Sequence, residues 1–206
     1  MTDTKSILQK YRVVPVVVFH SIEEVRPKLR AMCDGGLPVA EITYRTACAG
    51  EAIRIAISEF PEMLVGAGTV INTTQAEEAI SLGAKFIVSP GFSIEAAACC
   101  KEKQIPYLGG CVTPTEIMTA LRCGCDIIKF FPASVFGGLA AMKALSAAFP
   151  AVTFLPTGGI SEKNLAEYLA WDKIFAVGGS WMMKGAPDEI TEKCRTCVSI
   201  AGAANQ

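Results

Sequence analysis

The chain has 206 residues, of which 51% are hydrophobic and 19% are charged, and its formal net charge is −1. This composition favours a large packed core over disorder, and the charge balance gives no basic surplus for nucleic acid or anionic lipid. The apolar runs are shorter than the roughly 20 residues that a membrane helix needs, and residues 1–12 form a polar, helix-like segment without a signal sequence. We therefore expect a cytoplasmic protein with no nucleic-acid or membrane partner.

Short apolar runs rich in β-branched residues alternate along the chain with helical patterns. Eight of these runs are predicted as strands, at residues 13–19, 38–44, 63–68, 85–89, 105–110, 126–131, 152–156 and 173–179. The helical patterns between them include residues 21–36, 73–84, 93–103 and 113–124. Several of these begin at Ser or Thr with Glu close behind, and several end in Gly, as helix termini commonly do.

Alternating strands and helices predict a parallel sheet covered by helices. Eight such units favour a closed (β/α)8 TIM barrel with an N-terminal helix, in a single domain covering residues 1–206. An open doubly wound sheet is the alternative, but it normally carries a glycine-rich turn after its first strand. Here the first strand runs into "VFHSIEE", which has no glycine.

In a barrel, the functional side chains lie at the carboxyl ends of the strands, so those positions are of most interest. In the second strand, Glu41, Thr43 and Arg45 share one face because side chains alternate along a strand. They form either a surface ion pair or a carboxylate and a guanidinium that point into the barrel near its mouth. The apolar neighbours of Glu41 favour a covered strand and thus the second interpretation.

The residues that follow the first, third and fourth strands indicate a function less clearly. The third strand ends in "GAGT", where Thr69 offers a hydroxyl to a ligand or caps the next turn. Pro90 follows the fourth strand and fixes a loop. His20, the single histidine, follows the first strand and is better explained as a structural or peripheral residue than as a metal ligand, since a metal site needs several converging ligands.

The sixth strand, "DIIKFF", places Lys129 among apolar residues, on the same face as Ile127 and Phe131. On an edge strand such a lysine would reach water, but a closed barrel has no edge. If the side chain points inward, burial disfavours its charged form. A neutral amine beside a carbonyl substrate forms a Schiff base, so Lys129 is a candidate nucleophile.

The last two strands end in "PTGGIS" and "VGGSWM". The loops after the seventh and eighth strands are the usual phosphate site of this fold, although glycine pairs also form tight turns. The candidate phosphate ligands are Gly158, Gly159, Gly179 and Ser180. The nine cysteines are best explained as reduced, packed thiols, with a zinc site formed by Cys123, Cys125, Cys194 and Cys197 as the alternative.

Eight motifs occur in order over nearly the whole chain: "VPVVV", "AEITYRT", "VGAGTV", "IVSPGF", "TPTEI", "IKFFPA", "LPTGGI" and "GGSWM". Together they closely resemble the class I 2-keto-3-deoxy-6-phosphogluconate (KDPG) and 4-hydroxy-2-oxoglutarate (KHG) aldolase family. The resemblance implies a homotrimer of (β/α)8 barrels that acts on a small 2-keto acid and needs no metal or organic cofactor. One departure is "LGGC", where the family usually has Pro-Gly, and it leaves open the shape of the loop around Gly109 and Cys111.

The resemblance also implies roles for individual residues. Lys129 resembles the Schiff-base lysine and Glu41 the general acid and base. The remaining carried-over positions are Arg45 and Thr69 as contacts of the pyruvate carboxylate, Pro90 and Phe131 as pocket walls, and Gly158, Gly159, Gly179 and Ser180 as the phosphate cradle.

The implied reaction cleaves KDPG to pyruvate and glyceraldehyde 3-phosphate, with KHG, which gives pyruvate and glyoxylate, as a second substrate. The sequence does not choose between KDPG, its galactonate epimer and KHG. Two alternatives stay open. One is a phosphosugar isomerase or epimerase that uses Glu41 as a base without an imine. The other is a catalytically silent barrel that serves as an oligomeric scaffold.

Overall fold

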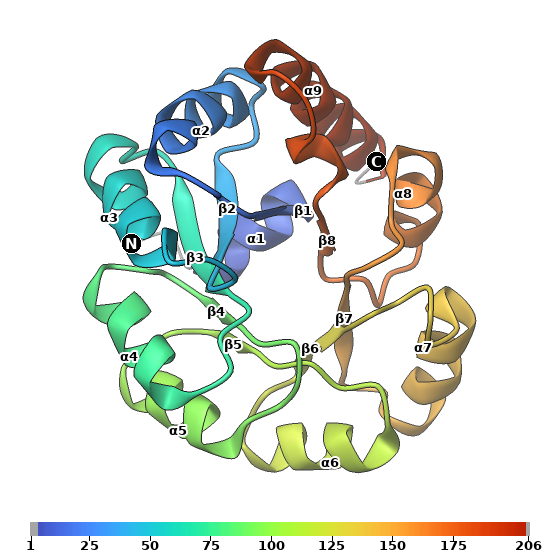
Figure 1. Cartoon of the computed structure of the whole chain (residues 1–206). Coiled ribbons are helices and arrows are strands. Elements are labelled where there is room, and N and C mark those ends of the chain that lie inside the picture. The colour runs from blue at the N-terminus through green and yellow to red at the C-terminus, as the bar shows by residue number, and fades with distance from the viewer. Residues whose placement is uncertain (1–3, 205–206) are drawn as a thin grey trace.

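The computed structural model describes residues 4–204 and consists of eight strands inside a ring of helices (Figure 1). The strands are β1 (Val13–Val17), β2 (Val39–Thr43), β3 (Leu64–Gly68), β4 (Ile87–Val88), β5 (Tyr107–Leu108), β6 (Ile127–Phe130), β7 (Thr153–Pro156) and β8 (Val177–Gly179). Every predicted strand is present, and each is shorter than expected because its ends turn into loops before pairing with a neighbour.

The strands close into a barrel in the order of the chain. Six of them pair in the order β5-β4-β3-β2-β1-β8, and β6 pairs with β7; all of these pairs are parallel. Single bridges complete the circle, between Gly110 and Lys129 on one side and between Thr157 and Gly178 on the other. The predicted (β/α)8 barrel is therefore confirmed, and the open doubly wound sheet is excluded.

The helices form the outer layer of the molecule, except for α1. Their bounds are α1 (Thr4–Tyr11), α2 (Val25–Asp34), α3 (Ala49–Glu59), α4 (Thr73–Ser81), α5 (Ile94–Glu102), α6 (Pro114–Arg122), α7 (Gly138–Ala148), α8 (Glu162–Leu169) and α9 (Pro187–Ala203), with short 3-10 turns η1 (Ile22–Glu24) and η2 (Trp181–Met183). The expected caps are present at Ser93, and at Thr113, which forms a capping box with Glu116. Helix α4 is capped by Asn72 rather than by a threonine.

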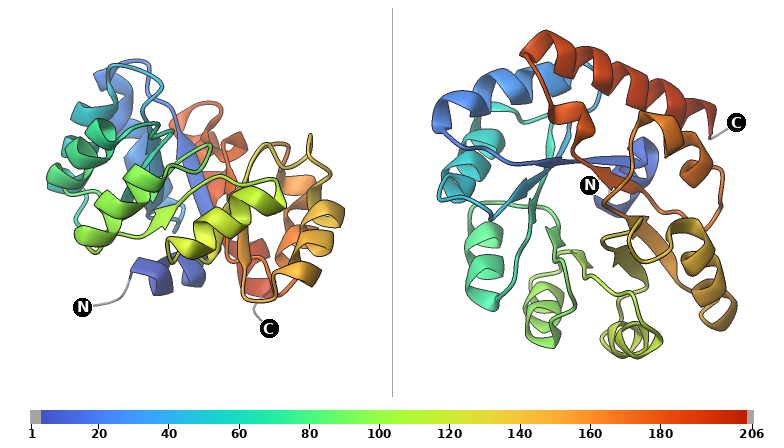
Figure 2. Two further views of the ribbon diagram at one scale, coloured as in Figure 1. Left: turned by 90° about the horizontal axis from the view of Figure 1, so that it is seen from below. Right: turned by 45° about the vertical axis from the view of Figure 1, so that its right-hand side comes forward.

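The hydrophobic core has two layers, as a barrel requires. Between the strands and the outer helices lies the larger layer. The smaller layer fills the barrel itself and includes Val39, Phe86 and Ile127, early in their strands or just before them, together with Leu8 of α1. Helix α1 therefore closes the end of the barrel at which the strands begin, and Figure 2 shows it lying below the strands and apart from the ring. The opposite end remains for a substrate.

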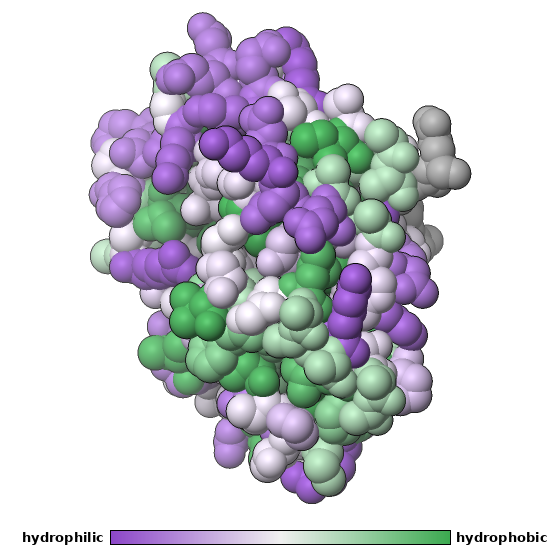
Figure 3. Space-filling view, turned by 90° about the vertical axis from the view of Figure 1, so that its right-hand side faces the viewer, coloured by the Kyte–Doolittle hydropathy of each residue, from purple (hydrophilic) through white to green (hydrophobic). Residues whose placement is uncertain are grey.

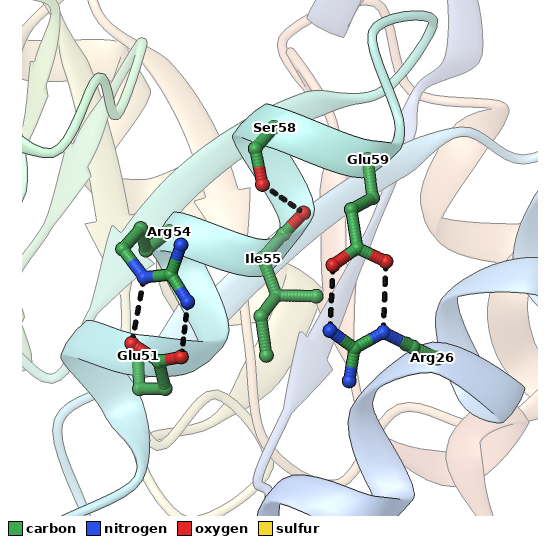
Figure 4. A network of polar contacts seen from close by, with 6 residues as sticks. All are labelled: Arg26, Glu51, Arg54, Ile55, Ser58 and Glu59. Atoms are coloured by element: carbon green, nitrogen blue, oxygen red, sulfur yellow. Dashed lines mark hydrogen bonds and ion pairs between the residues drawn. The ribbon is translucent and has the colours of Figure 1, made fainter.

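The outer helices also carry exposed ion pairs. Figure 4 shows Arg26 of α2 paired with Glu59 of α3, with 2.6 Å between Nη2 and Oε1, and Arg54 paired with Glu51 within α3. Exposed pairs of this kind contribute at most about 1 kcal/mol each, so they support the helix layer without determining the fold. Within residues 4–204, no helix is long and apolar enough to cross a membrane.

Candidate active site

A lysine and a glutamate face each other inside the barrel. Lys129 Nζ lies 3.3 Å from Glu41 Oε1, and the two side chains are 2% and 0% exposed. Lys129 comes from β6 and Glu41 from β2, so strands on different sides of the barrel supply the two partners. Because both residues occupy inward positions of their strands, the alternation of side chains brings them together. Lys129 is therefore a buried residue of the interior and not an edge-strand lysine that reaches water.

The backbone of Lys129 is held by the loop that departs from the family pattern. Lys129 N donates to Gly109 O over 3.1 Å, and Cys111 N donates to Lys129 O over 2.9 Å. Between them, a Cβ on Gly110 would lie only 1.9 Å from the carbonyl oxygen of Pro90. Only glycine permits this close approach. The "LGGC" segment thus fixes the strand that carries the amine.

Glu41 has room in the barrel because β3 presents glycine opposite it. A Cβ on Gly68 would lie 2.3 Å from Glu41 Oε1. The second carboxylate oxygen, Oε2, is buried and has no hydrogen-bond partner among residues 4–204. A buried acceptor without a partner costs about 1–3 kcal/mol. Oε2 is therefore available to accept a hydrogen bond from a substrate hydroxyl or a water molecule.

Thr157 provides a second unpaired polar atom, and the sequence analysis missed it. Its Oγ1 is buried without a partner in the described part of the chain, at the point where β7 ends and bridges to Gly178. The signal was present in "PTGGIS", since Thr157 is the hydroxyl residue directly before the two glycines. A hydroxyl residue at a strand end is common, so the sequence alone did not distinguish Thr157 from the glycines that follow it.

Arg45 and Thr69 lie together just beyond the ends of β2 and β3. Arg45 Nε donates to Thr69 Oγ1 over 2.9 Å. This is the single hydrogen bond of the Arg45 side chain within residues 4–204, so both terminal guanidinium nitrogens can bind a carboxylate. Thr69 has a φ of 53°, in the left-handed region that non-glycine residues seldom occupy. Thr43, on the same face as Glu41, is engaged instead in a 3.0 Å bond to the carbonyl of Val17.

Phe131 lies close to the amine and Pro90 lies against the backbone segment that holds Lys129, whereas His20 does not take part. Lys129 Nζ is 5.5 Å from the centre of the Phe131 ring. Pro90 follows β4, and its carbonyl packs on the segment that holds Lys129. His20 is exposed in the loop after β1, and no hydrogen bond joins its side chain to these residues.

The glycine pair after β7 lies beside the ring of Phe131, as the contacts of Gly158 show. Gly158 and Gly159 have φ values of 92° and 79°. The side of Gly158 without a side chain faces the Phe131 ring, since a Cβ there would lie 3.4 Å from Phe131 Cδ2. The loop after β7 therefore lies against Phe131 and becomes exposed at Gly159.

Gly179 at the end of β8 has a different reason for being glycine. A Cβ at this position would lie 1.7 Å from the ring of Trp181. The indole occupies the side-chain position of Gly179, and this contact alone requires glycine there. Ser180 follows directly as the residue before η2, and its side chain makes no capping bond.

The cysteines are free thiols, and several are packed in the core. Burial raises the pKa of Cys100, Cys111, Cys194 and Cys197 to about 12. Within residues 4–204, no three His, Cys, Asp or Glu side chains are grouped so that they could hold a metal ion.

A parallel barrel that buries a lysine against a carboxylate near its open end defines a class of enzyme: a carbon–carbon lyase that works through a Schiff base. The sequence profile of the aldolases described as KDPG and KHG aldolase matches residues 4–193. The chain belongs to the KDPG and KHG aldolase family.

Individual relatives agree with this assignment. A 2-dehydro-3-deoxy-phosphogluconate aldolase from Treponema pallidum is 45% identical over 85% of this chain and 84% of its own length. The crystal structure of the KDPG aldolase of Zymomonas mobilis with 3-phosphoglycerate has a TM-score of 0.92, with 37% identity over 97% of each chain. The KDPG aldolase of Legionella pneumophila, with pyruvate captured as a covalent carbinolamine, has a TM-score of 0.87 and 35% identity over 98% of each chain.

Proposed function

We propose that this chain cleaves 2-keto-4-hydroxy acids to pyruvate and an aldehyde, with KDPG as the main substrate and KHG as a second one. The observation that carries the proposal is the buried contact of 3.3 Å between Lys129 Nζ and Glu41 Oε1. The relatives support it, since they include KDPG aldolases and one in which pyruvate was captured covalently.

The reaction begins at Lys129. Its neutral amine attacks the C2 ketone of the substrate, and loss of water gives a protonated imine. Glu41, directly or through a water molecule, removes the proton of the C4 hydroxyl, and the C3–C4 bond breaks with its electron pair moving toward the imine. The resulting enamine is reprotonated at C3 and hydrolysed to pyruvate, which frees the amine. Glu41 can perform the proton transfers because one oxygen contacts the amine and the other has no protein partner.

The other candidate residues would position the substrate. Arg45 and Thr69 would bind the C1 carboxylate, which fixes the ketone against the amine. Phe131 and Pro90 would form the walls of the pyruvyl pocket. The hydroxyl of Thr157, buried without a partner, would bond a hydroxyl of the sugar chain. The distal phosphate would lie at the loops after β7 and β8, with Gly158, Gly159, Gly179 and Ser180 as its ligands.

Borohydride reduction in the presence of pyruvate tests the mechanism. The expected product is a protein with one added pyruvyl group, which peptide mapping places on Lys129. An adduct on another lysine, or none at all, would overturn the imine mechanism. Absence of an adduct together with sugar-phosphate isomerisation would instead indicate an isomerase or epimerase, and absence of any pyruvate release would indicate a silent barrel. A variant of an exposed lysine on the outer helix α5, Lys101→Ala, is the matched control.

We further propose that the protein is a homotrimer. Large apolar side chains are exposed at Ile71, Ile94, Met118, Val135 and Phe136, which fits an apolar interface with further copies of the chain. Figure 3 shows hydrophobic residues gathered on the side of the molecule where α7 lies. Light scattering after gel filtration should give three times the 21.8 kDa of one chain. Phe136→Glu should lower that mass, and a monomeric parent protein would refute the proposal.

The remaining expectations concern the domain and the compartment. We propose that residues 1–206 fold as one unit, since α1 closes the barrel and α9 packs on α2. Residues 1–3 and 205–206 lie outside the described part. The nine free cysteines support a reducing, cytoplasmic location. A single cooperative melting transition and nine titratable thiols after unfolding would agree with both proposals; two transitions or a shortfall of thiols would contradict one of them.

A further inference from the structure

A serine outside the residues considered so far lies beside the candidate phosphate loop. Ser134 follows β6, four residues before α7 begins. Ala133 N donates to Thr157 O over 2.8 Å, and Ser134 N donates to Gly158 O over 3.1 Å. The loop after β6 is thus held against the loop after β7, beyond the carboxyl ends of both strands. This is the open end of the barrel.

The side chain of Ser134 lies directly on Gly159. A Cβ on Gly159 would lie 2.0 Å from Ser134 Oγ and 2.3 Å from Ser134 Cβ. Ser134 is exposed, and its hydroxyl has no hydrogen-bond partner within residues 4–204. Gly159 therefore provides the space in which the Ser134 hydroxyl lies against the loop and remains free to bind a ligand.

The position of Ser134 relative to the amine matches the distal end of a substrate. The Phe131 ring is next to the Lys129 amine, and Gly158 is next to the Phe131 ring. Gly159 and Ser134 come one step farther out. A KDPG molecule joined at C2 to the amine carries its phosphate on C6, so its chain would run outward along this wall toward the hydroxyl.

A phosphate at this point needs hydrogen-bond donors. Successive left-handed glycines turn backbone N–H groups toward an anion, and a hydroxyl beside them adds one more donor. A hydrogen bond between a neutral donor and a charged acceptor is among the stronger ones in proteins. We propose that Ser134 Oγ donates to the distal phosphate of the substrate and makes the enzyme prefer phosphorylated 2-keto acids. This inference rests on the proposed aldolase function.

The test compares two substrates that differ only in the phosphate: KDPG and 2-keto-3-deoxygluconate. For Ser134→Ala, we expect the KM for KDPG to rise roughly tenfold with little change in kcat, since a contact remote from the reacting carbons is lost from ground and transition states alike. The values for 2-keto-3-deoxygluconate should stay within about twofold of the parent enzyme. Ser134→Thr keeps a hydroxyl and should retain most of the preference.

A control and a second measurement separate a specific loss from general damage. Ser58→Ala removes a hydroxyl that donates to Ile55 O within α3, on the outer surface (Figure 4). It should leave kcat and KM unchanged for both substrates. Inorganic phosphate should compete with KDPG, and its inhibition constant should rise in Ser134→Ala. Equal losses on both substrates, or no change for KDPG, would overturn the role of Ser134.

Failure of this inference can be told apart from failure of the proposed function. The pyruvate adduct on Lys129 should form in the parent and in each Ser134 variant, since pyruvate carries no phosphate. If the parent forms no adduct and cleaves neither substrate, the aldolase function fails. If the parent forms the adduct and cleaves KDPG while Ser134→Ala keeps the parent preference, only the role of Ser134 fails.

Discussion

Replacing Glu41 should separate the structural role of the buried ion pair from its chemical role. Glu41→Gln keeps an oxygen near the position of Oε1, 3.3 Å from the Lys129 amine, whereas Glu41→Leu leaves the amine with no partner. Removing one member of a buried ion pair costs about 3–5 kcal/mol. A retained neutral acceptor should reduce this cost to about 1–2 kcal/mol. For a protein of this size, 1 kcal/mol corresponds to roughly 2–4 °C in Tm.

The expected Tm therefore falls by roughly 3–6 °C for Glu41→Gln and roughly 9–15 °C for Glu41→Leu. Turnover of KDPG should fall at least about a hundredfold in Glu41→Gln, because a positioned acid and base contributes two to four orders of magnitude. Trapping of pyruvate on Lys129 by borohydride should persist, since the amine is intact. The assays are thermal melting, coupled detection of pyruvate release, and mass spectrometry after reduction.

Two results would refute this reasoning. Turnover near the parent value in Glu41→Gln would mean that the carboxylate only supports the fold. Equal melting temperatures for the Gln and Leu variants would mean that the contact with the amine contributes nothing. Glu59→Gln is the control, because Glu59 forms an exposed pair with Arg26 and should change Tm and turnover little.

Further predictions follow from single contacts. Lys129→Ala should abolish both cleavage and pyruvate trapping while the melting transition remains cooperative; residual trapping would point to another lysine. Gly68→Ala should reduce kcat strongly, because its Cβ would lie 2.3 Å from Glu41 Oε1, and unchanged kinetics would contradict that geometry. Leu8→Ala should lower the free energy of unfolding, measured in urea, by about 2–4 kcal/mol, since Leu8 packs inside the closed end of the barrel. A loss below about 1 kcal/mol would mean that α1 does not close this end of the barrel. Burial raises the pKa of Cys100 to about 12, so its thiol should resist iodoacetamide in the folded protein at pH 8, and rapid labelling would argue against its burial. The free energy of unfolding should fall as the pH rises above about 8.5, the pKa of a thiol in the unfolded chain, because only the unfolded chain then loses the thiol proton.

The pairing of Lys129 with Glu41 shows what the sequence could predict. Alternation along a strand predicted which side chains share a face with each residue, and the number of strands indicated a closed barrel without an edge, so an inward orientation was the favoured interpretation for each. Strand alternation and strand number can both be read from the sequence without knowing which residues touch. Strand ends were less predictable, because they depend on where neighbouring backbones stop pairing. The β4 and β5 strands have only two residues each, although five and six were expected.

Gly179 and Thr157 show what the sequence could not predict. A glycine before a turn is compatible with an anion site, with a tight turn, or with a bulky neighbour. The structure places the Trp181 ring beside Gly179, and this contact depends on the turn into η2. A Gly179→Val variant would therefore displace the indole and would not test phosphate binding alone. Thr157 is the opposite case, a candidate site residue that the sequence did not indicate. A hydroxyl at a strand end is common, and only the burial of Thr157 Oγ1 without a partner distinguishes it.

The two halves of the site differ in how they are held. Lys129 and Glu41 are on strands. Gly109, directly after β5, fixes the backbone of Lys129, and Gly68 of β3 leaves the space for the Glu41 side chain. The chemistry of the imine is sensitive to small displacements, so this half gains from a rigid support. The proposed distal half consists of the loops after β6 and β7, which are joined to each other by the bond from Ser134 N to Gly158 O. Substitutions in these loops can alter which substrates bind, while Lys129 and Glu41 stay in place. Substrate preference should therefore depend on loop residues such as Ser134 rather than on Lys129 and Glu41.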